Sequence, residues 1–166
     1  FTIRENAQPS RFQTWKRTVK DTSYQQQPAV IFTHKLLIND TVIDWARTIC
    51  HRQTLANLYH ETWNRQRGSE IFDFVKGTLF MNNQLVTAAD TTQRDKQAFE
   101  GFAKARSMYS LNWHADLELF PLLPFNDSAV LIVPFYHPGG SGPVQADYRV
   151  TGSAVYKDAN DLETDC

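Results

Sequence analysis

The stretch that decides the fold runs from Thr41 to Asp90 and reads TVIDWARTICHRQTLANLYHETWNRQRGSEIFDFVKGTLFMNNQLVTAAD. Its first half carries apolar residues at helical spacing, which predicts one amphipathic helix over residues 41–64. The apolar stripe comprises Val42, Trp45, Ala46, Ile49, Cys50, Ala56, Tyr59 and Trp63. Asp40 or Thr41 can cap this helix, and Gly68 follows its last turn. The sequence therefore predicts a single main helix within a chain of strands.

Most of the remaining chain shows strand patterns. The predicted strands are residues 29–38, 70–80, 84–88, 111–119, 129–133 and 144–156. Apolar and polar residues alternate from Leu111 to Leu119, which is typical of a strand with one buried face. Together these strands predict an all-β fold, an antiparallel jelly-roll sandwich of the eight-stranded type. The residues expected inside it are Trp113, Leu117, Leu119, Val130, Ile132, Val144, Tyr148 and Val150.

The ends of the chain differ in character. We interpret residues 1–27 as an extended N-terminal arm and residues 28–166 as a single jelly-roll domain, because 166 residues suit one core. The arm contains five cations that could contact RNA or neighbouring subunits, namely Arg4, Arg11, Lys16, Arg17 and Lys20. A flexible terminus without a partner is the alternative. Residues 90–100 are polar and are expected to form a long loop; a helical turn through Phe99 and Phe102 is the alternative.

The charges are unevenly distributed, although the formal net charge is only -1. Residues 1–114 contain 15 Lys and Arg against 10 acids, whereas residues 115–166 contain 2 against 8. A net charge near zero provides no global attraction for nucleic acid or membranes. The unevenness indicates either two differently charged ends or a basic inner surface with an acidic outer one.

The sequence shows no catalytic or metal-binding constellation. Ser141 lies in a Gly-Gly-Ser-Gly-Pro loop that lacks the helix required after a phosphate loop or a nucleophile elbow. The five histidines are His34, His51, His60, His114 and His137. None has metal-ligand spacing to another, and His114 beside Asp116 is more simply a polar strand face than an acid–base pair. Cys50 and Cys166 form no disulfide framework. We therefore expect no enzyme, no cofactor and no metal.

Targeting signals are also absent from the sequence. No charged-then-apolar signal segment occurs, and no apolar run approaches transmembrane length, so we expect no membrane partner. Glycosylation sequons begin at Asn39 and Asn126. Such short sequons arise often by chance, and without a secretion signal they carry no weight.

The order of the motifs resembles the jelly-roll capsid proteins of picorna-like icosahedral RNA viruses. The first matching part comprises Leu55-Ala56-Asn57-Leu58-Tyr59, Trp63, Arg67-Gly68-Ser69, Ile71, Phe72, Phe74 and Leu85-Val86. Residues 126–136, NDSAVLIVPFY, look like the family's strand ending in Val-Pro-Tyr or Val-Pro-Phe, and residues 142–162 look like its closing strands. The short length is most similar to the small subunits of plant secoviruses of the cheravirus and comovirus type.

This resemblance implies a structural capsid subunit. It would assemble with two other jelly-roll subunits, cut from one polyprotein, into an icosahedral shell around viral RNA. The expected location is the virion, and the host cytoplasm during assembly. Two other classes remain open: a β-sandwich module that binds carbohydrate or another ligand through Trp15, Trp113 and Tyr136, and a small α+β enzyme with a cleft around His114.

Overall fold

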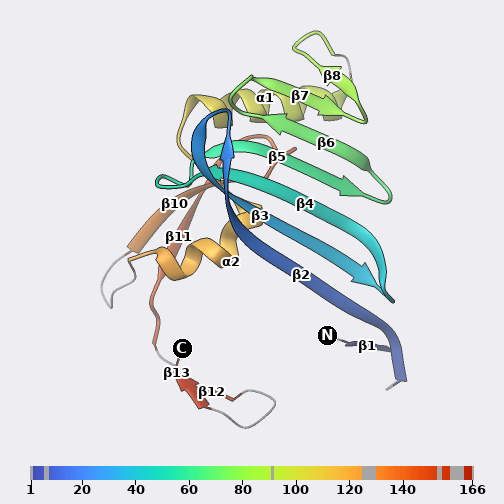
Figure 1. Ribbon diagram of the computed structural model, residues 1–166, viewed down its shortest axis with the longest axis vertical. Helices are drawn as coiled ribbons and strands as arrows, with labels where there is room; N and C mark the ends of the chain where they lie inside the picture. The colour runs from blue at the N-terminus through green and yellow to red at the C-terminus, as the bar shows by residue number, and fades with distance from the viewer. Residues whose placement is uncertain are drawn as a thin grey trace.

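The computed structural model describes residues 2–5, 8–90, 92–124, 130–152, 155–157 and 163–165. Eight antiparallel strands form one curved sheet, in which each strand pairs with the next strand of the chain (Figure 1). Their bounds are β1 Thr2–Glu5, β2 Gln8–Tyr24, β3 Gln27–Ile38, β4 Thr41–His51, β5 Asn57–Asn64, β6 Gly68–Asp73, β7 Thr78–Met81 and β8 Gln84–Val86.

Tight turns set the register of this sheet. Three hairpins close through two residues, namely Gln25-Gln26, Asn39-Asp40 and Asn82-Asn83, and both residues of each turn have positive φ. Two-residue turns of this kind match the right-handed twist of paired strands. Asparagine tolerates the left-handed conformation well, which suits Asn82-Asn83 to this turn.

The second layer is built by the C-terminal half of the chain. Its elements are α1 Gln93–Ser107, β9 Leu111–Asn112, η1 Trp113–Ala115, α2 Asp116–Leu119, η2 Phe120–Leu122, β10 Val130–Tyr136 and β11 Val144–Arg149. The strands β9, β10 and β11 form a small sheet of their own, and β12 Val155–Lys157 pairs with β13 Glu163–Asp165.

This layer covers one face of the main sheet, which we call the inner face. Under β6–β8, the helix α1 packs Ala98 and Phe102 against a cluster that includes Phe72 and Leu79. Under β3 and β4, a second cluster joins Phe32, Cys50, Leu111, Ala115, Leu119, Val133 and Phe135. On the opposite face of the main sheet, the outer face, most side chains of β2 are exposed, whereas those of β3 and β4 are mostly half-buried or buried, with Lys35 and Arg47 exposed.

The all-β antiparallel class is confirmed, whereas the jelly-roll order of strands is not. A jelly roll is built from Greek keys, in which strands adjacent in space are not adjacent in the chain. The main sheet instead keeps its eight strands in chain order. The predicted strand at 29–38 is confirmed as β3. The strand predicted over 70–80 is divided by a turn at residues 74–77 into β6 and β7, and the strand predicted over 84–88 appears as β8.

The predicted main helix over residues 41–64 is wrong, because this segment forms β4 and β5. Both faces of β4 carry apolar side chains: Ala46 and Cys50 point inward, while Trp45 and Ile49 lie on the outer face. When both faces of a strand are apolar, adjacent residues such as Trp45-Ala46 and Ile49-Cys50 are both apolar. Here these pairs recur every four residues, which resembles the spacing of an apolar stripe on a helix. The β-branched content of TVIDWARTIC, which favours a strand, is the better indicator.

The predicted strand over 111–119 is also wrong beyond Asn112. The Asn112 side chain accepts a hydrogen bond from the His114 backbone N–H (2.9 Å) and starts the turns η1 and α2. In this conformation the buried residues lie four apart, at Leu111, Ala115 and Leu119. Of the eight residues expected inside, only Leu119 is fully buried and Tyr148 is half-buried. The other six are exposed: Trp113, Leu117, Val130, Ile132, Val144 and Val150.

Two further predictions need correction. Residues 1–27 do not form an arm apart from the domain, because β2 pairs with β3 from Gln13 to Tyr24 and belongs to the main sheet. Residues 90–100 are not a long loop, because α1 begins at Gln93. The Thr92 side chain caps it by accepting a hydrogen bond from the Asp95 backbone N–H (3.1 Å).

Candidate functional site

The outer face of the main sheet carries a row of cationic and aromatic side chains across four strands. Lys16 on β2 lies opposite Lys35 on β3, which lies opposite Trp45 on β4, and Trp63 on β5 continues the row. Paired strands lie about 4.8 Å apart, so these side chains are neighbours on one surface. We call this surface the basic sheet face; it comprises Lys16, Lys20, Lys35, Trp45, Arg47 and Trp63.

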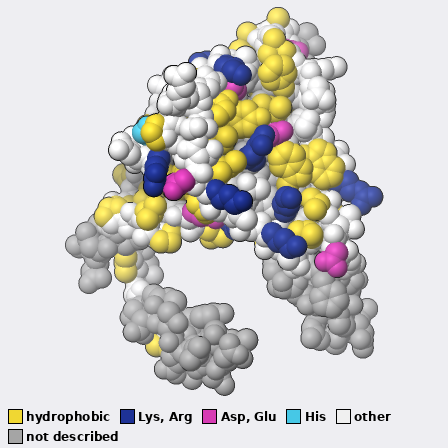
Figure 2. All heavy atoms as spheres, in the orientation of Figure 1, with side chains coloured by type: hydrophobic (Ala, Val, Ile, Leu, Met, Phe, Trp, Pro, Cys, Tyr) yellow, Lys and Arg dark blue, Asp and Glu magenta, His cyan; other side chains and the backbone are white. Residues whose placement is uncertain are grey.

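The basic sheet face is hollowed. An open hollow of about 710 Å³ is lined by Thr18, Lys20, Ile31, Thr33, Lys35, Val42, Trp45, Arg47 and Glu61. Figure 2 shows this side of the molecule, with Lys and Arg side chains set between hydrophobic ones. The combination of exposed cations with an apolar and aromatic floor suits a ligand that has both negative charges and flat apolar groups.

The positive charge of this face is only partly neutralised. Arg47 forms an ion pair with Glu61, the one carboxylate among the described residues that line the hollow, and lies 5.7 Å from the centre of the Tyr59 ring. Within the described residues, Lys16 and Lys35 form no ion pair. Like charges directly opposite each other destabilise a strand pair. The Lys16–Lys35 pair therefore opposes folding, and an anionic ligand would relieve this repulsion.

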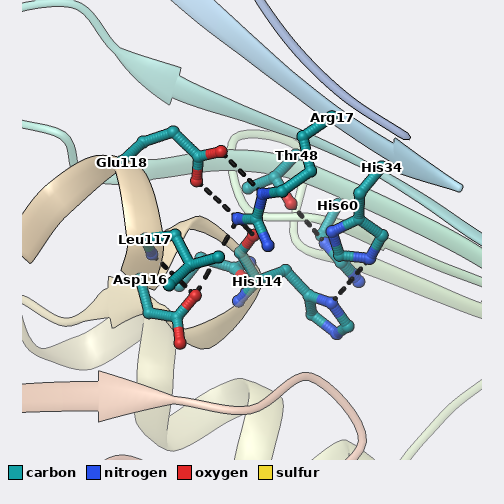
Figure 3. A network of polar contacts seen from close by, with 9 residues as sticks. Arg17, His34, Thr48, His60, His114, Asp116, Leu117 and Glu118 are labelled. Atoms are coloured by element: carbon teal, nitrogen blue, oxygen red, sulfur yellow. Dashed lines mark hydrogen bonds and ion pairs between the residues drawn. The ribbon is translucent and has the colours of Figure 1, made fainter. Parts of the chain in front are cut away.

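On the inner face, four of the five histidines meet although they are distant in sequence. His34 on β3 and His60 on β5 belong to the sheet, whereas His114 lies in η1 and His137 follows β10. The His114 ring stacks between His60 and His137, with ring centres 4.7 and 5.3 Å away. Its Nδ1 lies 3.2 Å from Nε2 of His34 (Figure 3). We call these four residues the histidine cluster.

The surroundings of the cluster favour uncharged rings. Burial, together with the neighbouring histidines His34 and His137, lowers the pKa of His114 to about 3. Burial lowers the pKa of His60 well below its ordinary value, and its Nδ1 bonds to the Thr48 hydroxyl (2.9 Å) while its buried Nε2 has no partner. Burial also lowers the pKa of His34 and of His137. At neutral pH the cluster is therefore a stack of neutral imidazoles.

The stacking geometry does not favour a metal centre. The nitrogen lone pairs of an imidazole lie in the ring plane, so rings stacked at 28° and 25° do not direct their nitrogens to one point. No group of three or more His, Cys, Asp or Glu side chains within the described residues could hold a metal ion. The cysteine Cys50 is buried and free, and burial raises the pKa of its thiol to about 12.

A charged pair closes the cluster on one side. Arg17 on β2 donates two hydrogen bonds to Glu118 on α2 (2.7 and 2.5 Å) and one to the His114 carbonyl (3.1 Å), as Figure 3 shows. Asp116 lies 3.8 Å from the same guanidinium. Arg17 thus joins α2 to the inner face. Asp116 and Glu118 face Arg17, so they do not form the acid–base row with His114 that a strand would give.

The structure separates the five cations of the predicted arm. Lys16 and Lys20 lie on the basic sheet face, whereas Arg17, one position along the strand, lies on the inner face. Arg4 and Arg11 belong to β1 and β2, and their side chains lie outside the described part. The acidic C-terminal segment, whose charges would repel RNA and predict a place at the exterior or at an interface, is also largely outside the described residues.

Other candidate residues do not gather into one site. Trp15 and Trp113 are about half exposed, each with its ring edge on a neighbour, whereas Tyr136 is fully buried and cannot contribute to a surface that stacks sugars. Sequence reasoning missed Lys35, Arg47, Trp45 and Trp63 as site residues. A two-residue turn at Gln25-Gln26 places Lys16 opposite Lys35, so this turn is the signal that finds Lys35.

Comparison of the chain with protein-family models, with curated proteins and with solved structures found no match. None of the helices among the described residues has the length and apolar character needed to cross a bilayer. The functional interpretation therefore depends on the geometry of the basic sheet face and of the histidine cluster.

Proposed function

We propose that this protein binds single-stranded nucleic acid, with RNA as the ligand, on the basic sheet face. The observation that carries the proposal is the direct opposition of Lys16 and Lys35, beside Trp45 and Trp63, with no carboxylate paired to either lysine within the described residues. Lysines neutralise phosphates without reading sequence. Aromatic rings on an open sheet provide platforms on which unpaired bases stack.

The chemistry of the face favours a single strand over a duplex. Paired bases are stacked on each other and present no free ring to a tryptophan, whereas a single strand can place phosphates on the lysines and bases on the aromatic row. The protein's net charge of -1 gives no long-range attraction. Binding should therefore be local, moderate in affinity and strongly dependent on salt.

Fluorescence anisotropy with a labelled single-stranded RNA of about 15 nucleotides tests the proposal between about 50 and 200 mM salt. In the double variant Lys16→Gln/Lys35→Gln, two phosphate contacts are lost, so binding should weaken and the salt slope should become shallower by about 1.4. Lys96→Gln is the matched control, because Lys96 is exposed on α1, the helix under the inner face. Equal effects of both changes, or an unchanged salt slope in the double variant, would contradict the proposal.

A single charge reversal separates the cost to the fold from the benefit to binding. Lys16→Glu replaces a like-charged cross-strand pair by an opposite-charged one, so we expect the free energy of unfolding to rise by about 0.2–1 kcal/mol. RNA affinity should fall in the same variant. Urea unfolding and the anisotropy titration measure the two effects. A loss of stability, or a gain of stability without a loss of affinity, would show that the Lys16–Lys35 pair is not kept for an anionic ligand.

A structural capsid subunit, the function implied by the sequence resemblance, is a second proposal. A face that binds RNA without reading sequence suits the inside of a shell. The small sheet also exposes apolar side chains, with Ile132 59% and Val144 67% exposed, and a neighbouring subunit would cover such residues. Electron microscopy of native material decides this proposal: shells that contain the chain and RNA are expected, and a chain recovered only as a free monomer would contradict it.

A further inference from the structure

We propose that the histidine cluster is an acid-sensitive latch: with neutral rings it holds residues 111–119 against the inner face of the main sheet, and protonation in mild acid releases this segment. The proposal is independent of RNA binding, because the cluster and the basic sheet face lie on opposite sides of the same strands. Neighbouring residues of β2 and β3 separate the two: Lys16 from Arg17, and His34 from Lys35.

The ring arrangement accepts added protons poorly. Nδ1 of His114 and Nε2 of His34 are 3.2 Å apart, so one nitrogen of this pair donates and the other accepts. If both rings were protonated, two N–H groups would point at each other. His60 is fully buried with Nε2 unpartnered, so a charge on His60 would have no counter-charge. A positive charge on His34 or on His60 would also oppose protonation of His114, whose ring stacks on that of His60.

The carboxylates that face the cluster are already engaged. Glu118 and Asp116 on α2 face Arg17 of β2, itself a cation next to the cluster. Asp44 on β4 accepts a hydrogen bond from the Asn64 amide (2.8 Å), and Glu70 on β6 is paired with Arg94 of α1. Arg67, between β5 and β6, adds a further positive charge and lowers the pKa of His114 and of His137 after the effect of burial. The carboxylates of Glu118, Asp116 and Glu70 thus face arginines, whereas Asp44 keeps its charge and favours a protonated His34, an effect that is smaller than those of burial and of Arg17.

Apart from the histidine cluster, residues 111–119 are anchored by the Arg17 hydrogen bonds to Glu118 and to the His114 carbonyl, by the pairing of β9 with β10, and by three buried apolar side chains. Residues 111–119 bury the side chains of Leu111, Ala115 and Leu119 in the apolar cluster, while Trp113 and Leu117 are 44% and 59% exposed. Asn112 is buried but makes no apolar contribution. Segments with few buried apolar contacts open at a lower free energy than the core strands. Release of this segment would expose His60, His114 and His34 to solvent while β3–β6 stay paired.

The direction of the pH effect follows from the lowered pKa values. Above the ordinary histidine pKa of about 6.5 the rings are neutral in both states, so pH has no effect. Below this pH, the histidines bind protons in the open state but not yet in the closed state, so acid favours opening. The effect ends when the pH falls through the pKa of the closed state, which is about 3 for His114. Each such histidine contributes up to about a tenfold change in the opening equilibrium per pH unit. His137 is the most exposed of the four residues, so its contribution is the smallest.

Amide hydrogen exchange on the intact chain tests the latch between about pH 6.5 and 5, where histidines titrate and ordinary carboxylates remain charged. We expect the protection factors of residues 111–119 to fall by at least about tenfold per pH unit, while β3–β5 keep theirs. In His114→Gln, whose side chain cannot titrate, this pH dependence should weaken by about tenfold per unit. If that variant does not fold, His34→Gln makes the same test.

His51→Gln is the control, because His51 is the last residue of β4 and lies outside the cluster, with its Nδ1 3.2 Å from the Thr54 hydroxyl. This variant should behave as the wild type. Three results would overturn the proposal: constant protection of residues 111–119 down to pH 5, loss of protection in β3–β5 at the same pH, or an equal effect of His51→Gln.

Discussion

Replacing Phe72 with Ala should lower the free energy of unfolding by about 3–5 kcal/mol, the range for truncating a large buried aromatic side chain. Phe72 on β6 is fully buried between the main sheet and α1. Its ring lies 5.8 Å from Phe102 of α1, 6.0 Å from His60 and 6.5 Å from Tyr136. It thus joins the sheet, the helix and the histidine cluster, and the cavity left by its removal cannot collapse without moving all three.

Leu117→Ala provides the matched control for this experiment. The sequence alternation predicts that Leu117 is buried, so that its truncation would cost about 2–5 kcal/mol. In the structure it lies on α2 and is 59% exposed, so the cost should be below about 0.5 kcal/mol. Guanidinium unfolding at neutral pH measures both variants. Similar losses in the two, or a loss below about 1 kcal/mol for Phe72→Ala, would mean that α1 does not pack as described.

These two residues show where the sequence is sufficient and where it is not. Phe72 belongs to a strand bounded by Gly68 and a turn, and its β-rich neighbours predict a strand there, although not the turn that ends it at Asp73. The alternation around Leu117 is accidental, because Asn112 caps a helical turn and thereby changes which residues share a face. The apolar pattern over residues 111–119 could not distinguish a strand from a helical turn, since Leu111 and Leu119 are buried in both structures.

The same reasoning explains the missed helices and strands. Residues 41–64 form strands with apolar side chains on both faces, so their hydrophobic pattern lacks the alternation that indicates a strand with one buried face. For α1, the capping residue Thr92 and the spacing of Ala98, Phe102 and Ala105 are the local signals, and they are weak because the intervening residues are mostly polar. Local sequence signals are present in residues 41–64 and in α1, but packing against distant segments of the chain determines which secondary structure forms.

The candidate sites depend on long-range pairing and could be predicted only in part. Lys16 and Lys20 were identified from their charge, but their separation from Arg17 follows from strand alternation in a segment expected to be an arm. The histidine cluster joins β3, β5, η1 and the residue after β10, and no spacing rule connects these positions. The sheet order and the folding of η1 onto the inner face bring these residues together.

The loop that follows His137 illustrates a further limit of sequence patterns, and it provides the second large expected effect. The glycine-rich segment 139–142 is typical of a mobile hairpin loop, yet it is seated on α1 at Gly101. A Cβ atom added to Gly101 would lie 1.9 Å from the Gly140 carbonyl oxygen and 2.9 Å from the Gly142 nitrogen. These are backbone atoms, so the contact cannot be relieved by turning a side chain.

Gly101→Ala should therefore destabilise the protein by about 1–3 kcal/mol, the usual cost of overpacking. Helix propensity alone predicts the opposite sign, since alanine in a helix interior is favoured over glycine by about 1 kcal/mol. Ala103→Gly, at an exposed position of α1, measures that propensity without the clash and should cost about 1 kcal/mol. The displaced loop should also move His137 away from His114, which NMR of the imidazole protons would detect. A stabilised Gly101→Ala variant with unchanged histidine signals would show that α1 and the loop are not in backbone contact.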